Sequence, residues 1–292
     1  MNSWKALSKA KEILTAGGII GLPTETVYGL AGSIDSEEAI QRIFAIKDRP
    51  FFDPLIVHIA SIKQIEAITL EWTSTQNSLA ERFWPGPLTI IARKSPNLNP
   101  MITAGLDTVA IRMPSHPLAR RLLRSLKHPL AAPSANKFGR TSPTRYEHVL
   151  SEFSGSDLFV LEGGEAAVGI ESTVIRVTED AHRIDLEILR PGMITKSDFI
   201  LALKDFAKKP FDVSLRASTS SPGHTQTHYQ PSIPLVIATR NLSTQNVAYI
   251  EKDLNVPERS RYSELNLNPD PRLAARDLYH QMRKISESGA AW

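Results

Sequence analysis

The sequence IIGLPTETVYG occupies residues 19–29 and joins an apolar run to a polar segment. Residues 19–22 have the length and composition of a short buried strand. Before this run, apolar side chains recur every three or four residues up to Gly17-Gly18, which predicts an amphipathic helix that ends there. After it, Ser36 precedes two glutamates, a pattern typical of a helix N-terminus. The local order is therefore helix, strand, polar segment and helix.

The same alternation continues to about residue 205. Short apolar segments bounded by proline, glycine or charge predict strands at 55–60, 88–92, 109–113, 130–132, 158–161, 173–177 and 187–189. Helical patterns lie between several of them, at 73–83, 117–126, 144–153 and 197–206. This alternation predicts an α/β domain with a mixed sheet.

The character of the sequence changes after this domain. From Lys208 to Pro231 the chain is polar and rich in turn formers, which predicts a linker. In the tail that follows, 233–238 resembles a strand and 272–288 a helix. A tail of this length is small for a core of its own, so we expect it to lean on the first domain. We therefore divide the chain into 1–206, 207–231 and 232–292.

Composition and missing motifs exclude several kinds of chemistry. The 292 residues carry a formal net charge of +3 and no cysteine, so disulfides, thiolate nucleophiles and Cys-ligated zinc are excluded. The Gly-rich dinucleotide fingerprint, the P-loop, the His-Glu-x-x-His zinc motif and the Gly-x-Ser-x-Gly elbow are all missing. We expect no protein-bound metal site. No apolar run approaches the length of a membrane span, and the first residues lack the apolar core of a signal peptide, so we expect a cytoplasmic protein.

Two pairs of polar residues remain as candidates for a binding site. Lys47 and Arg49 put two cations at the end of a predicted helix, where they complement the helix dipole or grip a polyanion. Ser134 and Asn136 follow an apolar strand, and α/β sheets bind ligands beyond the carboxyl ends of their strands. A turn or a helix cap explains the second pair equally well.

Polar residues inside predicted strands strengthen the case. Arg112 lies in the apolar run VAIRM and needs a carboxylate or phosphate partner. His58 fits either a core or a site, and Ser172 fits either a site or an edge strand. Taken together with Thr26, these residues supply cations and neutral hydrogen-bonding groups with few carboxylates. Such a set favours an anionic substrate, as in phosphoryl or nucleotidyl transfer.

Seven ordered motifs also resemble a known family. They are GLPTETVYGL at 21–30, KxRP at 47–50 with PLIVH at 54–58, FWPGPLT at 83–89, VAIR at 109–112, PSAN at 133–136, ESTV at 171–174 and RPG at 190–192. Together they span about residues 5–200 and resemble the YrdC/Sua5 family of threonylcarbamoyl-AMP synthases. The segment SPG at 221–223 followed by HYxP at 228–231 is similar to the linker of the two-domain branch. The resemblance implies a YrdC-like twisted mixed sheet with a basic concave surface, plus a small Rossmann-like C-terminal domain.

The resemblance also implies an activity. The family makes threonylcarbamoyl-AMP and pyrophosphate from ATP, L-threonine and bicarbonate with Mg²⁺, for the N6-threonylcarbamoyl modification of adenosine 37 in tRNA. Possible partners are then tRNA or tRNA-modification proteins. A non-catalytic RNA-binding module of the YrdC type is the alternative. A carbamoyl-transfer domain like those of hydrogenase maturation is set aside, because those proteins carry zinc-finger segments and this chain has no cysteine.

The resemblance assigns roles to individual positions. Matches to the signature that holds the nucleotide and its phosphates are Lys47, Arg49, Ser134 and Asn136. Matches to the threonine site are Thr26, His58, Arg112, Ala132 and Ser172, with Arg112 expected to pair with the substrate carboxylate. Further nucleotide contacts are Thr108, Ser142 and Arg190, and His228 and Tyr229 would close over ATP as a lid.

Two departures from the family pattern bear on these roles. Asp53 stands where the family usually has asparagine, so it would touch Mg²⁺ beside the ATP or weaken ATP binding. The tail is shorter than the usual second domain, which leaves open whether its Rossmann-like sheet is complete.

Overall fold

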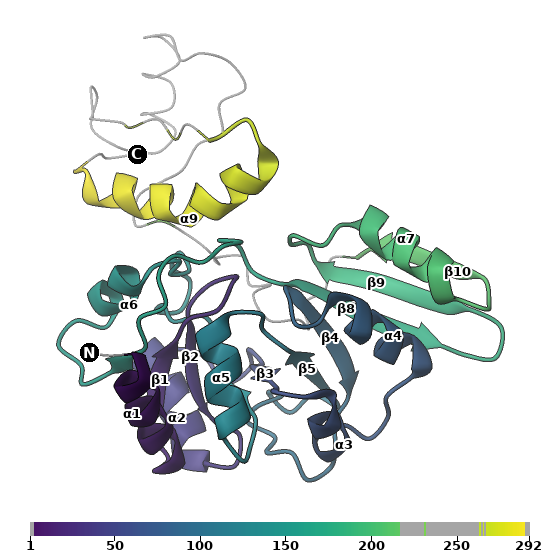
Figure 1. Cartoon of the computed structure of the whole chain (residues 1–292), viewed down its shortest axis with the longest axis horizontal. Helices are drawn as coiled ribbons and strands as arrows, with labels where there is room; N and C mark the ends of the chain where they lie inside the picture. Colours follow the sequence, from purple (N-terminus) through teal and green to yellow (C-terminus); the bar gives the residue numbers. More distant parts are fainter. Residues whose placement is uncertain (1–2, 217–230, 232–262, 264, 266, 290–292) are drawn as a thin grey trace.

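The computed structural model describes residues 3–216, 231, 263, 265 and 267–289, and this part of the chain contains one large mixed sheet (Figure 1). The strands run in the order β10-β9-β8-β4-β5-β3-β6-β2-β1-β7. They are β1 (Ile19–Leu22), β2 (Gly29–Ser33), β3 (Ile56–His58), β4 (Leu88–Arg93), β5 (Thr108–Arg112), β6 (Leu130–Ala131), β7 (Phe159–Val160), β8 (Thr173–Glu179), β9 (Ile184–Arg190) and β10 (Phe211–Leu215). The sheet contains both parallel and antiparallel pairs, so the predicted α/β class with a mixed sheet is confirmed.

Helices cover both faces of this sheet. They are α1 (Ser3–Thr15), α2 (Glu37–Lys47), η1 (Ile62–Gln64), α3 (Ile65–Ile68), α4 (Ser74–Phe83), α5 (Pro117–Ser125), α6 (Tyr146–Glu152), α7 (Lys196–Phe206) and α9 (Pro271–Glu287). Side chains alternate along β1: Ile19 joins the core cluster that contains α2, whereas Ile20 and Leu22 join the cluster that contains α1 and α5. The apolar run at 19–22 is therefore buried on both sides.

The predicted ends of the first two helices are confirmed. Gly17 follows α1 with a φ of +79°, a conformation that glycine adopts without a Cβ penalty. Ser36 caps α2, since its hydroxyl accepts a hydrogen bond from the Ala39 amide at 3.1 Å. These two local signals fix where α1 ends before β1 and where α2 begins after β2, a strand that the sequence did not predict.

The sheet extends beyond the predicted domain boundary at residue 206. Strand β10 pairs in parallel with β9 over five residues, and its Val213 is buried. The linker predicted at 207–231 therefore begins too early, because residues 211–215 belong to the sheet. The alternation of FDVSL is short and is flanked by polar residues, so it was hidden in a stretch that otherwise resembles a linker.

Helix α9 packs against the first domain, as expected for the tail. It coincides with the helix predicted at 272–288, and Asp270 caps it by accepting from the Arg272 amide at 2.7 Å. Tyr279 and Met282 on this helix form a small apolar cluster with Val27. The completeness of a Rossmann-like sheet concerns 232–262, which lie outside the described residues. Within the described part, no helix combines the length and the apolarity needed to cross a membrane.

Candidate functional site

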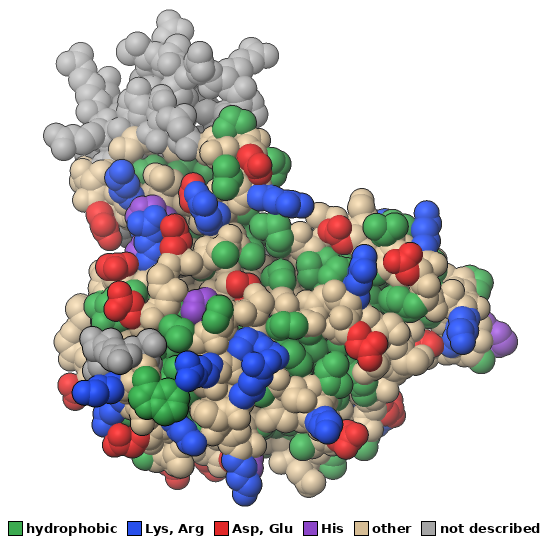
Figure 2. Space-filling model, viewed as in Figure 1, with side chains coloured by type: hydrophobic (Ala, Val, Ile, Leu, Met, Phe, Trp, Pro, Cys, Tyr) green, Lys and Arg blue, Asp and Glu red, His purple; other side chains and the backbone are tan. Residues whose placement is uncertain are grey.

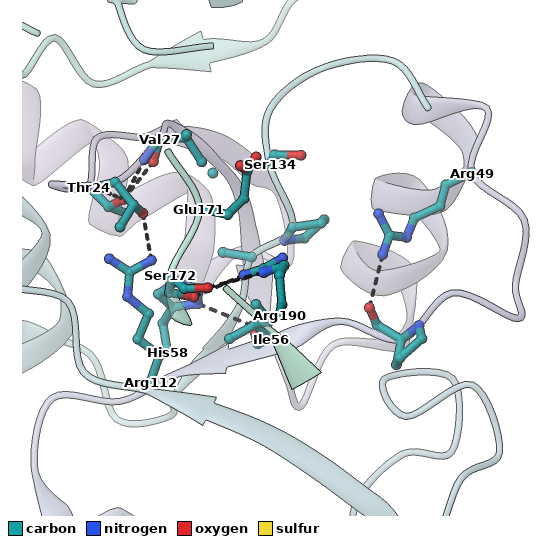
Figure 3. A pocket seen from close by; sticks show the side chains of 15 residues that line it. Thr24, Val27, Arg49, Ile56, His58, Arg112, Ser134, Glu171, Ser172 and Arg190 are labelled. Atoms are coloured by element: carbon teal, nitrogen blue, oxygen red, sulfur yellow. Dashed lines mark hydrogen bonds between the residues drawn. The ribbon is translucent and has the colours of Figure 1, made fainter. Parts of the chain in front are cut away.

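A polar hollow of about 520 Å³ lies where several strands end (Figure 3). This volume includes space that is open to solvent. Eight of the predicted site residues line it: Thr26, Arg49, His58, Arg112, Ala132, Ser134, Ser172 and Arg190. The cations assigned to the nucleotide and the groups assigned to threonine therefore share one cavity.

Strand register explains why these residues meet. Parallel pairing of β3 with β5 puts His58 beside Arg112 at the carboxyl ends of both strands. An isolated antiparallel bridge between Gly29 and Ser134 brings the loop after β6 next to the polar segment before β2. In Figure 3, Thr24, His58 and Arg112 lie on one side of the cavity and Arg49 on the opposite side.

Arg112 is held by three groups of the protein itself. Its Nη2 lies 2.7 Å from Glu25 Oε1, its Nη1 donates to Thr26 Oγ1 at 2.7 Å, and its Nε donates to the Gly86 carbonyl at 3.3 Å. Burial alone would raise the pKa of Glu25, but attraction and hydrogen bonding from Arg112 outweigh it and the net pKa is lowered. The carboxylate partner that Arg112 was expected to need is thus Glu25, which sequence reasoning missed.

Arg49 is also paired within the protein. Its Nη2 lies 2.8 Å from Asp53 Oδ2, and the same nitrogen donates to the Pro54 carbonyl at 2.9 Å. Both side chains are buried. Arg49 still lines the cavity, whereas Asp53 does not. The carboxylate predicted to stand near ATP or Mg²⁺ is instead turned to Arg49, and among the described residues that line the cavity Glu171 is the one carboxylate.

Lys47 and Asn136 do not line the cavity and instead hold the loop next to it through hydrogen bonds to backbone carbonyls. Lys47 is fully buried, and its Nζ donates to the backbone carbonyls of Ser134 and Asn136. The Asn136 amide donates to the carbonyls of Lys137 and Arg140, both at 2.8 Å. Burial, together with the nearby Arg49, holds the pKa of Lys47 well below its usual value. These two residues hold the loop that carries Ser134. Neither of them lines the cavity, although both were predicted to bind the nucleotide and its phosphates.

The other residues predicted to contact the nucleotide are Thr108, Ser142, His228 and Tyr229, and none of those that the structure describes lines the cavity. Thr108 begins β5, opposite Arg93, and so lies at the far end of the strand from Arg112 and outside the cavity lining. Ser142 is buried and donates its hydroxyl to Glu171 Oε1. His228 and Tyr229 lie outside the described residues. The nucleotide role of Thr108 was assigned from the family resemblance alone, since nothing in its local sequence predicted a site.

Hydroxyls and a neutral histidine line the part of the cavity that the sequence prediction assigns to threonine. Arg190 donates through Nη2 to Ser172 Oγ at 3.0 Å, and this hydroxyl lies 2.7 Å from Thr89 Oγ1. Burial and the charge of Arg112 lower the pKa of His58 to about 3. Its Nδ1 lies 3.1 Å from the Ile56 carbonyl, which assigns the hydrogen to Nδ1 and leaves Nε2 as an acceptor.

Glu171 is the second acidic residue without a role in the sequence prediction. It lines the cavity, and it accepts hydrogen bonds from the hydroxyls of Ser142 and Tyr279, the latter at 2.5 Å. No cluster of three or more metal-ligating side chains occurs among the described residues. Glu171 was visible in the ESTV motif, but nothing in the sequence indicated its partners, which come from 142 and 279.

The arrangement is suited to binding and orienting, since its arginines and hydroxyls are fixed before substrate arrives. The face in Figure 2 mixes acidic with basic side chains, and Lys and Arg gather over α5. Fold and cavity together define an α/β protein with a preformed polar site for small charged molecules at its strand ends.

Two family models match the chain. A model named for Sua5, YciO and YrdC and described as "Telomere recombination" matches residues 12–192. A second, described as "Threonylcarbamoyl-AMP synthase, C-terminal domain", matches residues 191–291. The chain belongs to the Sua5/YciO/YrdC family.

Two similar curated proteins have the same name. A "Threonylcarbamoyl-AMP synthase" of Bacillus subtilis is 41% identical over 241 residues, which cover 79% of this chain and 66% of the relative. A protein of the same name from Pyrococcus abyssi is 40% identical over 238 residues, covering 81% of this chain and 68% of the relative. The alignments thus span about two thirds of the relatives' length.

Solved structures share the fold. A crystal structure of P. abyssi Sua5 complexed with L-threonine superposes with a TM-score of 0.83 and 33% identity, covering 100% of this chain and 88% of that one. E. coli YciO, at 22% identity, has a TM-score of 0.53 over 65% of this chain and 90% of its own, and shows the fold alone.

Proposed function

We propose that this protein makes threonylcarbamoyl-AMP and pyrophosphate from ATP, L-threonine and bicarbonate. One observation carries the proposal: Arg49 and Ser134, assigned to the nucleotide, line the same cavity as Thr26 and Arg112, assigned to threonine. The names of the relatives and the threonine complex of the P. abyssi protein support the same activity.

The proposed reaction needs two bonds to form. The amine of threonine attacks the carbon of bicarbonate and gives a carbamate with loss of water. A carbamate oxygen then attacks the α-phosphorus of ATP, and pyrophosphate leaves. The carbamate and the phosphates are anionic, so preplaced cations such as Arg49 and Arg190 supply most of the stabilisation.

Arg112 contributes more than charge in this proposal. Its pairing with Glu25 and Thr26 fixes the plane of the guanidinium. Each of its two terminal nitrogens has a second N–H group that these contacts do not use, and we propose that these groups bind the substrate carboxylate. The hydroxyls of Thr26 and Ser172 and the acceptor nitrogen of His58 then surround the small polar substrate. Because these side chains are already fixed, they lose little conformational entropy when the substrate binds.

We also propose Mg²⁺ as a companion of ATP. The described residues hold no cluster of metal ligands, which fits a metal that arrives with the triphosphate and is held by phosphate oxygens and water. When bound, Mg²⁺ neutralises charge on the leaving pyrophosphate. We place the reaction in the cytoplasm and propose tRNA-modification proteins or tRNA as the recipients of the product.

Pyrophosphate release tests the proposed function. We expect release from ATP only when both L-threonine and bicarbonate are present, with threonylcarbamoyl-AMP detected by mass spectrometry. Release that does not depend on threonine would contradict the proposal. A protein that lacks turnover but binds RNA with a steep salt dependence would instead support the non-catalytic alternative.

A further inference from the structure

Three arginines and one carboxylate line the cavity, and Arg190 among them donates to Ser172. Arg49 is paired with Asp53 and Arg112 with Glu25, in each case within 2.8 Å. Glu171 differs, because its two oxygens accept hydrogen bonds from the neutral hydroxyls of Ser142 and Tyr279. In the part of the chain that the structure describes, no Lys, Arg or His pairs with it. The cavity wall therefore presents one carboxylate that lacks a positive partner.

A carboxylate in such a place favours a cationic ligand group. Taking an ion out of water is costly unless an opposite charge or several hydrogen bonds replace the water. The two hydroxyl donors satisfy one lone pair on each oxygen of Glu171 and leave acceptor capacity on both. The other polar groups of the cavity are arginines, hydroxyls and a neutral histidine, which suit anionic groups and hydroxyls.

Tyr279 reaches this carboxylate from a distant part of the sequence. It lies on α9, 108 positions after Glu171, and the helix lies across the domain on the side of α6 (Figure 1). Its ring is buried against Val27, which itself lines the cavity. Close to this contact, Gly169 touches the backbone of Arg276: a Cβ there would lie 2.2 Å from the Arg276 carbonyl oxygen. The ring packing and the close approach of α9 at Gly169 thus fix the position of Tyr279.

We propose that Glu171 binds the α-ammonium group of the amino-acid substrate, and that Tyr279 is the positioning residue that fixes this carboxylate together with Ser142. The C-terminal helix thereby completes the amino-acid subsite, although the rest of that subsite comes from residues 24–190. This inference rests on the proposed function, since it assigns the recognition of threonine's ammonium.

Binding of two ligands separates the ammonium contact from other effects. We would titrate the full-length protein with L-threonine and with 2,3-dihydroxybutyrate, which carries a hydroxyl in place of the ammonium. Glu171→Gln keeps the size of the side chain and removes its charge. We expect it to weaken L-threonine binding about 10- to 100-fold, the worth of a charge-assisted hydrogen bond, and to leave the analogue and ATP nearly unchanged.

The hydroxyl of Tyr279 is tested on its own and in combination. Tyr279→Phe keeps the packing against Val27, and we expect a loss of about three- to tenfold for L-threonine, because Ser142 still holds one carboxylate oxygen. If Tyr279 acts through Glu171, adding Tyr279→Phe to Glu171→Gln brings no further loss. Tyr146→Phe on α6, whose ring lies outside the cavity lining, is the matched control and should bind as the wild type does.

Each outcome decides one claim. Wild-type protein that fails to bind L-threonine contradicts the proposed function itself. If it binds but Glu171→Gln binds equally well, or loses the analogue as strongly as threonine, the ammonium contact is wrong. Additive losses in the double variant would show that Tyr279 does not act through Glu171. Unchanged ATP binding in each variant shows that the fold is retained.

Discussion

At the scale of single residues, Arg112 and Glu25 form a buried pair whose halves depend on each other. Glu25→Gln would leave the Arg112 cation buried without a counter-ion. Removing one partner of such a pair costs about 3–5 kcal/mol. We therefore expect the free energy of unfolding, measured with urea at pH 7, to fall by this amount. Arg112→Ala should likewise destabilise the fold through Glu25 as well as weaken threonine binding.

The pH dependence of this pair has a definite sign. The pKa of Glu25 is lower in the folded protein than its ordinary value of 4.5. Its stabilisation is therefore complete above pH 4.5 and is lost as the pH falls through the lowered value. The gap between wild type and Glu25→Gln should narrow in acid, and equal stabilities at pH 7 would contradict the prediction. A double variant, Glu25→Gln with Arg112→Met, should recover part of the loss.

Lys47 gives a second prediction for a single side chain. Lys47→Met keeps the length of the stem but removes the donor to the carbonyls of Ser134 and Asn136. Each buried group left without its partner costs about 1–3 kcal/mol, so for the two carbonyls we expect the free energy of unfolding to fall by roughly 2–6 kcal/mol. Thermal unfolding measures this loss. Unchanged stability with weaker ATP binding would instead support the phosphate contact that the sequence predicted.

At the scale of elements, local patterns predicted most strands and helices. They did not predict which strands pair when those strands are far apart in the sequence. The apolar run at 19–22 and the cap at Ser36 are local signals, and both are confirmed. Strand β10 was missed because its place depends on β9. The same limit applies to the site: Ser142 and Tyr279 meet Glu171 only through the fold, and no spacing in the sequence reveals these contacts.

The docking of α9 is open to a test at the element scale. Gly169→Ala would put a Cβ 2.2 Å from the Arg276 carbonyl oxygen, at a φ of +74°. We expect α9 to separate from the domain, seen as faster amide exchange in 271–287 and as weaker threonine binding. Gly164→Ala is the matched control, since its φ is +75° with nothing within 4 Å of the added Cβ. It carries only the backbone strain of about 1–2 kcal/mol.

At the scale of the whole molecule, the contact between α9 and the domain includes a histidine pair. The Nδ1 of His148 accepts a hydrogen bond from the Thr144 amide at 3.2 Å, so its Nε2 carries the hydrogen. That nitrogen lies 3.1 Å from Nδ1 of His280 on α9, and the rings stack. A proton on Nδ1 of either histidine breaks one of these bonds. The charged groups around the pair are Arg145, Arg283, Lys284, Glu165 and Asp277.

Acid should therefore loosen α9 and weaken the whole fold together. Burial, followed by the charges of Arg283 and His280, lowers the pKa of His148 to about 3, and burial with Arg112 does the same for His58. The unfolded chain then binds more protons than the folded one below about pH 6.5, so stability falls as the pH drops from 6.5 toward 3. For His58, which is fully buried, the slope is about 1.4 kcal/mol per pH unit.

Two measurements separate the global effect from the local one. Chemical denaturation between pH 7.5 and 5 should show the decline in stability, and amide exchange should show protection lost in 271–287 at a higher pH than in β4. His182→Gln, at an exposed turn, should leave both profiles unchanged, whereas His148→Phe keeps a stacked ring without a titrating group and should flatten the response of α9. Two imidazoles that are neutral in the folded protein and take up a proton on unfolding must make the free energy of unfolding depend on pH. A wild-type protein that is equally stable at pH 5 and pH 7.5 would therefore contradict the prediction that His58 and His148 set this dependence.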